Sequence, residues 1–196
     1  MSQAPVPSLD EVIVVSLSTA DQPVLKLVGG KAASLIRLQQ AGFDIPQGVV
    51  LTTQFFEPWL SEIQTSSEWR SVIETLPTRS ARRLNLKQRE VLARLCDHVK
   101  SLASTFPVNA SQQKQIDAIE PDLGSGSYAV RSSSPEEDLG GASFAGLYET
   151  VLGVDSASLT DAIRTCFCSC LDARVLLYKA EMNFESFTPA IAVVVQ

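Results

Sequence analysis

Two isolated cations and one run of small residues are the features of this sequence that could act on a phosphate group. Lys31 directly follows a glycine pair, and Arg131 precedes a polar segment that leads into the small-residue loop Gly140–Gly146. Residues without bulky side chains let backbone N–H groups approach an anion and form a concave nest. A guanidinium grips phosphate as a fork, and a lysine at a helix start adds a point charge beside amides that face an anion. The pattern indicates a phosphate site built from two distant parts of the chain.

The same residues also have plainer interpretations, which the residue types alone leave open. A loop with the composition of Gly140–Gly146 is a simple hairpin connection in most proteins. Ser134–Glu137 could equally begin a helix with an acidic first turn. Each cation could belong to a surface salt bridge instead of a phosphate site.

Histidine and cysteine do not suggest catalysis or metal binding in this chain. The single histidine, His98, has no second ligand or nucleophile at a telling spacing, so we predict a structural or solvated role. Cys166, Cys168 and Cys170 fall in one predicted helix, where a spacing of two places side chains about 200° apart. Together with Cys96 they are predicted to be buried or half-buried small apolar residues in a reducing compartment.

The hydrophobic pattern predicts the elements that must position the first cation. Val12–Leu17 and Val49–Leu51 are typical of short strands, and a helix is predicted to start at the lysine after the glycine pair and to end at Gly42. A further helix, capped by Thr52 or Thr53, carries an aromatic cluster that we expect in the core.

The stretch from Ser66 to Glu120 is helical in period and carries no distinctive chemistry. Its most regular part is Leu86–Leu102. The predicted inward stripe of this helix consists of Val91, Leu95, His98, Val99 and Leu102.

Arg131, the second cation, lies in a predicted β-hairpin. Ser127–Arg131 and Tyr148–Leu152 are the expected strands, and the small-residue loop connects them. A long helix is then predicted from Asp155 to about Met182. Ala190–Gln196 has the pattern of a strand and ends in the middle of an expected sheet, which suggests that its partner strands are missing.

Composition limits the class of protein. Hydrophobic residues make up 45% and charged residues 19% of the chain, as in an ordinary folded domain, and the net charge of −6 argues against a nucleic-acid or anionic-membrane surface. The longest apolar run is too short to span a bilayer. No lysine or arginine precedes Lys26, so a secretory signal is not expected and the predicted location is cytoplasmic.

Two blocks of sequence together resemble the ATP-binding domain of the family of pyruvate phosphate dikinase, phosphoenolpyruvate synthase and rifampin phosphotransferase. The blocks stand in the family's order and span most of the chain. The first comprises Gly29–Leu35 (GGKAASL), Ala41–Val50 (AGFDIPQGVV) and Thr52–Thr53; the second comprises Ala129–Ser134 (AVRSSS), Glu137–Asp138 and Ala142–Thr150 (ASFAGLYET).

The resemblance implies an ATP-grasp fold of the α+β class, with a mixed or antiparallel sheet, flanking helices and an incomplete C-terminal side. It implies that the positions of Lys31 and Arg131 contact ATP phosphates, that Gly146 and Thr150 line the nucleotide, and that Gln196 approaches the adenine. Ser143 is a further loop candidate. The expected organisation is a flexible lead-in over 1–10 and the first part of the ATP-binding module over 11–196, with a helical insert at about 66–120.

The family reaction implied by this resemblance converts ATP to AMP and passes a phosphoryl group through a histidine on a separate domain to pyruvate or a related acceptor such as rifampin. The family's Mg²⁺ ligands and relay histidine lie in parts that this chain does not contain. We therefore expect partners, namely the second ATP-grasp half and the phosphohistidine domain, and predict that the isolated chain is inactive.

Departures from the family pattern leave other possibilities open. Pro135 replaces a small or hydroxyl residue and Leu147 replaces a frequent glutamine, although neither change removes a charge. The alternative hypotheses are a non-catalytic nucleotide-binding or regulatory module, and a fragment that folds poorly when alone.

Overall fold

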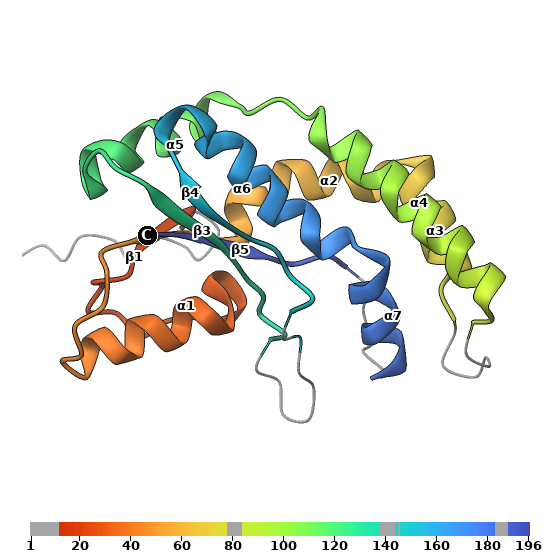
Figure 1. The fold of residues 1–196 in the computed structure, drawn as a ribbon, viewed down its shortest axis with the longest axis horizontal. Coiled ribbons are helices and arrows are strands. Elements are labelled where there is room, and N and C mark those ends of the chain that lie inside the picture. The colour runs from red at the N-terminus through yellow and green to blue at the C-terminus, as the bar shows by residue number, and fades with distance from the viewer. Residues whose placement is uncertain (1–11, 78–83, 138–143, 145, 183–187) are drawn as a thin grey trace, which may run out of the picture.

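A five-stranded sheet with helices on both faces forms the framework (Figure 1). The computed structural model describes residues 12–77, 84–137, 144, 146–182 and 188–196. Its strands run in the order β1-β2-β5-β3-β4, and every neighbouring pair is antiparallel. The predicted α+β class is confirmed, and the sheet is of the antiparallel kind. The strands are β1 Val14–Ser16, β2 Val49–Leu51, β3 Tyr128–Ser133, β4 Thr150–Val154 and β5 Ala192–Val195.

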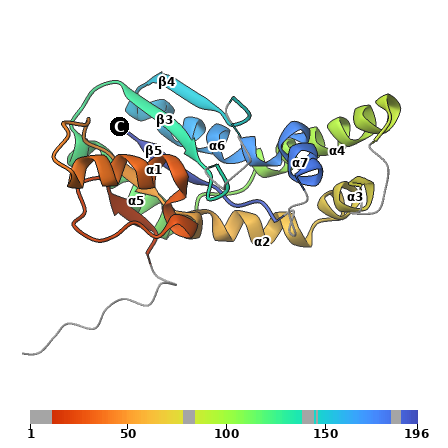
Figure 2. The ribbon, with the colours of Figure 1, turned by 90° about the horizontal axis from the view of Figure 1, so that it is seen from below.

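One helix covers one face of the sheet, and the remaining helices gather on the other. Helix α1, Leu25–Gln40, lies across β3 and β5 (Figure 2). Short 3₁₀ turns at Thr53–Phe56, Ser156–Ser158 and Ser169–Leu171 connect several of the other elements. The helices of the opposite layer are α2 Glu57–Thr65, α3 Ser67–Thr75, α4 Leu86–Ser104, α5 Ala110–Leu123, α6 Leu159–Cys168 and α7 Ala173–Glu181.

The two faces of the sheet bury different kinds of side chain. Between α1 and the sheet the core is small, with Ala32 and Ala33 packed beside Val194. The opposite core is larger and aromatic, and Phe56 stacks on Phe167 with ring centroids 5.0 Å apart. Small residues let α1 approach the strands closely. The prediction that the aromatic cluster belongs to the core is confirmed.

The strand nearest the end of the sequence is central, so the prediction that its partners are missing is wrong. β5 pairs with β2 on one side and with β3 on the other, so that Val194 lies opposite both Val50 and Arg131. Its residues are buried on both faces. Sequence pattern reveals that a strand is buried but not which strands flank it.

The prediction of one long helix after Asp155 is also wrong, because the chain turns at Asp172. Asp172 has extended backbone angles, and its Oδ1 accepts a 2.9 Å hydrogen bond from the backbone N–H of Arg174. An aspartate that bonds to a nearby backbone amide offers the chain an alternative to continuing a helix. Asp172 therefore separates α6 and its 3₁₀ extension from α7.

The predicted stripe of α4 is displaced by about one position. Its buried residues are Leu92, Cys96, Val99 and Ala103, whereas Val91 is 45% exposed and His98 is also exposed. Cys96 and Ala103 act as small apolar core residues and complete a helical spacing of three and four. The predicted hairpin is confirmed, since β3 and β4 pair in antiparallel fashion.

Candidate functional site

The first turns of α1, around Gly29, pack against the end of β3. Gly29 interrupts the helix with φ 76° and ψ 171°, so regular helix follows it, as predicted. A Cβ atom on Gly29 would lie 2.1 Å from the carbonyl oxygen of Ser133, so only glycine fits there. The hydroxyl of Ser133 donates to the carbonyl of Val28 at 2.8 Å and accepts from the N–H of Ala32 at 3.0 Å. Helix and strand are thereby fixed to each other.

These contacts correct one part of the sequence-based hypothesis. Amides at the helix start were expected to face an anion, but the N–H of Gly30 donates to the carbonyl of Ser134 at 2.9 Å and that of Ala32 is bonded to Ser133. Two of the first amides of the helix therefore already have partners inside the protein. An anion near this point must rely mainly on side-chain cations.

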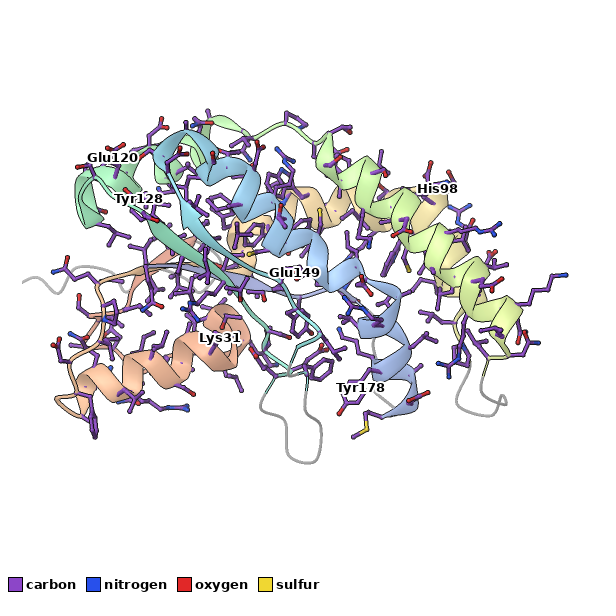
Figure 3. The ribbon with its side chains drawn as sticks, viewed as in Figure 1. Lys31, His98, Glu120, Tyr128, Glu149 and Tyr178 are labelled. Carbon is purple, nitrogen blue, oxygen red and sulfur yellow. The ribbon has the colours of Figure 1, made fainter. Side chains whose placement is uncertain are left out.

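The ammonium group of Lys31 lies between α1 and the sheet (Figure 3). It donates to the carbonyl of Ser132 at 2.7 Å, and lies 3.2 Å and 3.4 Å from the two carboxylate oxygens of Glu137. The side chain of Lys31 remains 32% exposed. The ammonium is thus anchored to the β3 backbone, on a side chain that is partly exposed.

Arg131 lies on the same face of the sheet as Lys31. Side chains alternate along a strand, and Ser133, two residues further on, bonds to α1. The register pairs Arg131 with Val194, which packs in the core beneath α1. Within the described residues the Arg131 side chain has no hydrogen bond or ion pair, and its Nε atom is buried. A buried donor without a partner costs about 1–3 kcal/mol, so it calls for an explanation.

The structure brings two of the four remaining predicted site residues, Thr150 and Gln196, to this face. Thr150 is exposed on β4 directly opposite Arg131. Gln196 exchanges backbone hydrogen bonds with Ala129 at 2.8 Å and 3.1 Å, and the alternation of β5 puts its side chain on the α1 side. Gly146 has φ 74°, and a Cβ atom there would meet no atom of the described residues within 4 Å. Ser143 lies outside the described residues.

Sequence reasoning missed a second ion pair, which holds the residues just after β3 from the side of α7. Lys179 on α7 is 1% exposed, and its Nζ lies 2.6 Å from the carboxylate of Glu136. Lys179 continues the buried stripe of α7 that contains Val175 and Leu176. A lysine on a buried stripe was a signal that a carboxylate partner must exist.

Aromatic contacts hold the same segment against α7. The rings of Phe144 and Tyr148 stack at 5.6 Å, and Phe144 meets Tyr178 edge-on at 4.8 Å. The hydroxyl of Tyr148 is 3.1 Å from that of Ser134. Burial raises the pKa of Tyr148 well above its ordinary value, so the phenol stays protonated and acts structurally.

Cations on the α6 side of the sheet offer a weaker alternative site. A depression of about 320 Å³ there is lined by Lys100, Arg164 and Asp172 among others. Lys100 lies 3.3 Å from the Asp172 carboxylate, and Arg164 donates to the carbonyls of Ala103 and Phe106 at 3.1 Å and 2.9 Å. These cations are already neutralised or hydrogen-bonded, in contrast to Arg131.

The cysteines and the histidine show no reactive arrangement. Burial raises the pKa of the Cys166 and Cys168 thiols to about 11 and that of Cys96 to about 12, so these thiols are protonated at neutral pH. His98 is exposed on α4, far from Lys31 (Figure 3). In the described ranges no three His, Cys, Asp or Glu side chains are grouped as metal ligands would be. Nor does any described helix have the length and apolar character to cross a membrane.

The fold and these contacts define the class of the protein as an α+β domain in which α1 and three antiparallel strands share one polar surface. Comparison with known families then gives its identity. The family described as pyruvate phosphate dikinase, AMP/ATP-binding domain, matches residues 25–196. The chain belongs to this family of AMP/ATP-binding domains.

Curated relatives agree with this assignment. A probable phosphoenolpyruvate synthase of Methanothermobacter thermautotrophicus is 31% identical over 173 residues, covering 87% of this chain and 25% of that protein. The phosphoenolpyruvate synthase of Aquifex aeolicus is 32% identical over an alignment that covers 100% of this chain and 22% of its own. The rifampicin phosphotransferase of Bacillus subtilis is 25% identical over 94% of this chain and 21% of its own. The chain thus spans about a quarter or less of these relatives' lengths.

Proposed function

We propose that the α1-facing surface of β3, β4 and β5 binds the polyphosphate of ATP between Lys31 and Arg131. The observation that carries this proposal is the Arg131 guanidinium, which is partly buried and has no partner among the described residues. A phosphate oxygen would satisfy its orphaned donors in a bidentate fork. Lys31 would add a second positive charge from the α1 side.

The other predicted residues receive complementary roles in this proposal. Thr150, opposite Arg131, would donate its hydroxyl to a phosphate or ribose oxygen, and Gly146 and Ser143 would line the nucleotide. Gln196, further along the same face, would approach the adenine. The contribution of these groups is to orient ATP and to neutralise its charge, which are the protein's main tasks in phosphoryl transfer.

The reaction itself is assigned to a longer protein. We infer that the ATP-binding portion works with a second ATP-grasp half and a phosphohistidine domain, converting ATP to AMP and passing a phosphoryl group to pyruvate or a related acceptor such as rifampin. Mg²⁺ is expected for such chemistry, and no group of three or more His, Cys, Asp or Glu side chains that could hold a metal ion occurs among the described residues. The division into a lead-in over 1–10 and a module over 11–196, and the cytoplasmic location, stay predictions.

Titration calorimetry with ATP tests the binding proposal. Hydrogen bonds to a charged group contribute about 1.5–3 kcal/mol, so Arg131→Met is expected to lower ATP affinity at least about ten-fold. Arg131→Lys, which keeps the charge but loses the fork, is expected to recover only part of it. Arg70→Met removes an exposed arginine from α3 and serves as the matched control.

Three results would count against the proposal or its extension. If Arg131→Met binds ATP as tightly as the unaltered chain, the guanidinium does not hold phosphate. If no heat accompanies ATP addition to any of the proteins, the alternative of an interaction or regulatory module is favoured. The isolated chain is expected to form no AMP from ATP, and detection of AMP above a heat-denatured control would overturn that expectation.

A further inference from the structure

Two adjacent glutamates that follow β3, Glu136 and Glu137, pair with lysines on two different helices. Glu136 meets Lys179 on α7, where the exposed side-chain fractions are 17% and 1%, and the two charged atoms are 2.6 Å apart. Glu137 meets Lys31 on α1, where the fractions are 19% and 32% and the separation is 3.2 Å. The first pair is short and its lysine is buried, whereas the second pair is longer and its lysine is partly exposed.

This difference in the burial of the two lysines gives the two glutamates different roles. A buried ion pair is costly to separate, because each charge would be left without water or a partner. A pair that water reaches through its lysine is easier to separate, and a fully exposed pair contributes only about 0–1 kcal/mol. Glu136 therefore fixes the segment in place, while Glu137 can release its lysine without disturbing the fold.

The contacts of Lys31 show what Glu137 occupies. An ammonium has three N–H donors, and one of them is committed to the carbonyl of Ser132 at 2.7 Å. The Glu137 oxygens, at 3.2 Å and 3.4 Å, lie beside the donors that remain. Charge-assisted bonds are commonly about 2.7–2.9 Å, so this pairing is loose. A phosphate oxygen that binds Lys31 must compete for the same donors and the same positive charge.

We propose that Glu137 is an internal counterion that occupies the anion position beside Lys31 and gives way to phosphate oxygens when a polyphosphate binds. This inference rests on the proposed function of Lys31 and extends it to ligand selection. The carboxylate lowers the affinity for every anion, and a ligand with several phosphate charges overcomes it more readily than a singly charged one. The backbone of Glu137 stays in place, since its N–H donates to the carbonyl of Ser134 at 3.3 Å, and only the side chain turns away.

The test compares ATP and inorganic tripolyphosphate binding to the unaltered chain and to Glu137→Gln by titration calorimetry at low ionic strength. Removing a competing counterion from this partly exposed pair is expected to tighten binding about two- to five-fold, and less at high salt. Tripolyphosphate carries no base, so a gain with both ligands locates the effect at the phosphates. Glu137→Ala repeats the test without a hydrogen-bonding amide.

Glu149→Gln is the matched control. It removes one negative charge beside Thr150, but the Glu149 side chain lines the depression on the α6 side. Tighter binding by Glu137→Gln and not by Glu149→Gln would support the inference, and equal gains in both would overturn it in favour of a general charge effect. Unchanged or weaker binding by the Glu137 variants, with ATP still bound by the unaltered chain, would overturn the inference alone. Failure of every protein to bind ATP would overturn the proposed function itself.

Discussion

Replacing Gly29 by alanine offers a sharp test of how α1 is joined to the sheet. The φ of 76° and ψ of 171° at Gly29 lie in a region that is almost confined to glycine, and a residue with Cβ there costs about 1–3 kcal/mol. The added Cβ would also lie 2.1 Å from the Ser133 carbonyl and 2.5 Å from its hydroxyl oxygen. Ser133 must then move away from α1.

The contact with Ser133 sets the expected extra loss. Its hydroxyl makes two hydrogen bonds to α1, with Val28 and with Ala32. At about 1 kcal/mol for each bond, their loss adds about 2 kcal/mol to the cost of the backbone conformation. We expect Gly29→Ala to lower the free energy of unfolding by about 4 kcal/mol in total.

Gly124 provides a matched control within the same chain. It has nearly the same conformation, with φ 85° and ψ 160°, but a Cβ there meets no atom of the described part of the chain within 4 Å. Gly124→Ala should therefore show the conformational cost of about 2 kcal/mol alone. The measurement is urea denaturation followed by circular dichroism, and with a slope of about 2 kcal/mol/M the two midpoints should differ by about 1 M. Equal losses in the two variants would refute the argument that Gly29 is needed for close approach.

Two further predictions concern the charges around α7. Burial alone raises the pKa of Asp172, but hydrogen bonds from Arg174 and the charge of Lys100 outweigh it and lower the pKa below the unfolded value of 3.8. The resulting stabilisation is present above that value and is lost as pH falls through the folded pKa. In urea titrations, the difference in unfolding free energy between the unaltered chain and Asp172→Asn should therefore shrink from pH 5 to pH 2. A constant difference would contradict this. Lys179→Met should cost about 3 kcal/mol because it leaves Glu136 unpaired, and adding Glu136→Gln should restore part of it; additive losses would exclude the pairing.

Local sequence signals identified much of the fold. The glycine pair before Lys31, the strand Val49–Leu51 and the β3–β4 hairpin were predictable because turn chemistry and hydrophobic period act over a few residues. The break at Asp172 was missed because one side-chain hydrogen bond decides it, within a stretch whose apolar spacing suits a continuous helix. The shifted stripe of α4 was missed because Cys96 and Ala103 are weak hydrophobic signals.

The candidate site could be predicted only in part, for a similar reason. Lys31 and Arg131 stand in recognisable sequence blocks, and the structure brings both to one face of the sheet. The partner of Lys31 is Glu137, 106 residues away, and no local pattern specifies that pairing. The ion pair between Glu136 and Lys179 likewise depends on how α7 packs. Sequence thus indicated which cations could bind phosphate, but not which carboxylates already accompany them.

The position of β5 explains how the two sequence blocks come to form one surface. β1 and β2 arise near the first block, β3 and β4 carry the second, and β5 lies between β2 and β3. Without it, the described strands would form two separate antiparallel pairs, because β2 and β3 are each hydrogen-bonded to β5 and not to each other. Val194 lies opposite both Val50 and Arg131, and its side chain packs in the core beneath α1. The strand that sequence reasoning left without partners is therefore the element that joins the two pairs of strands into one sheet beneath α1.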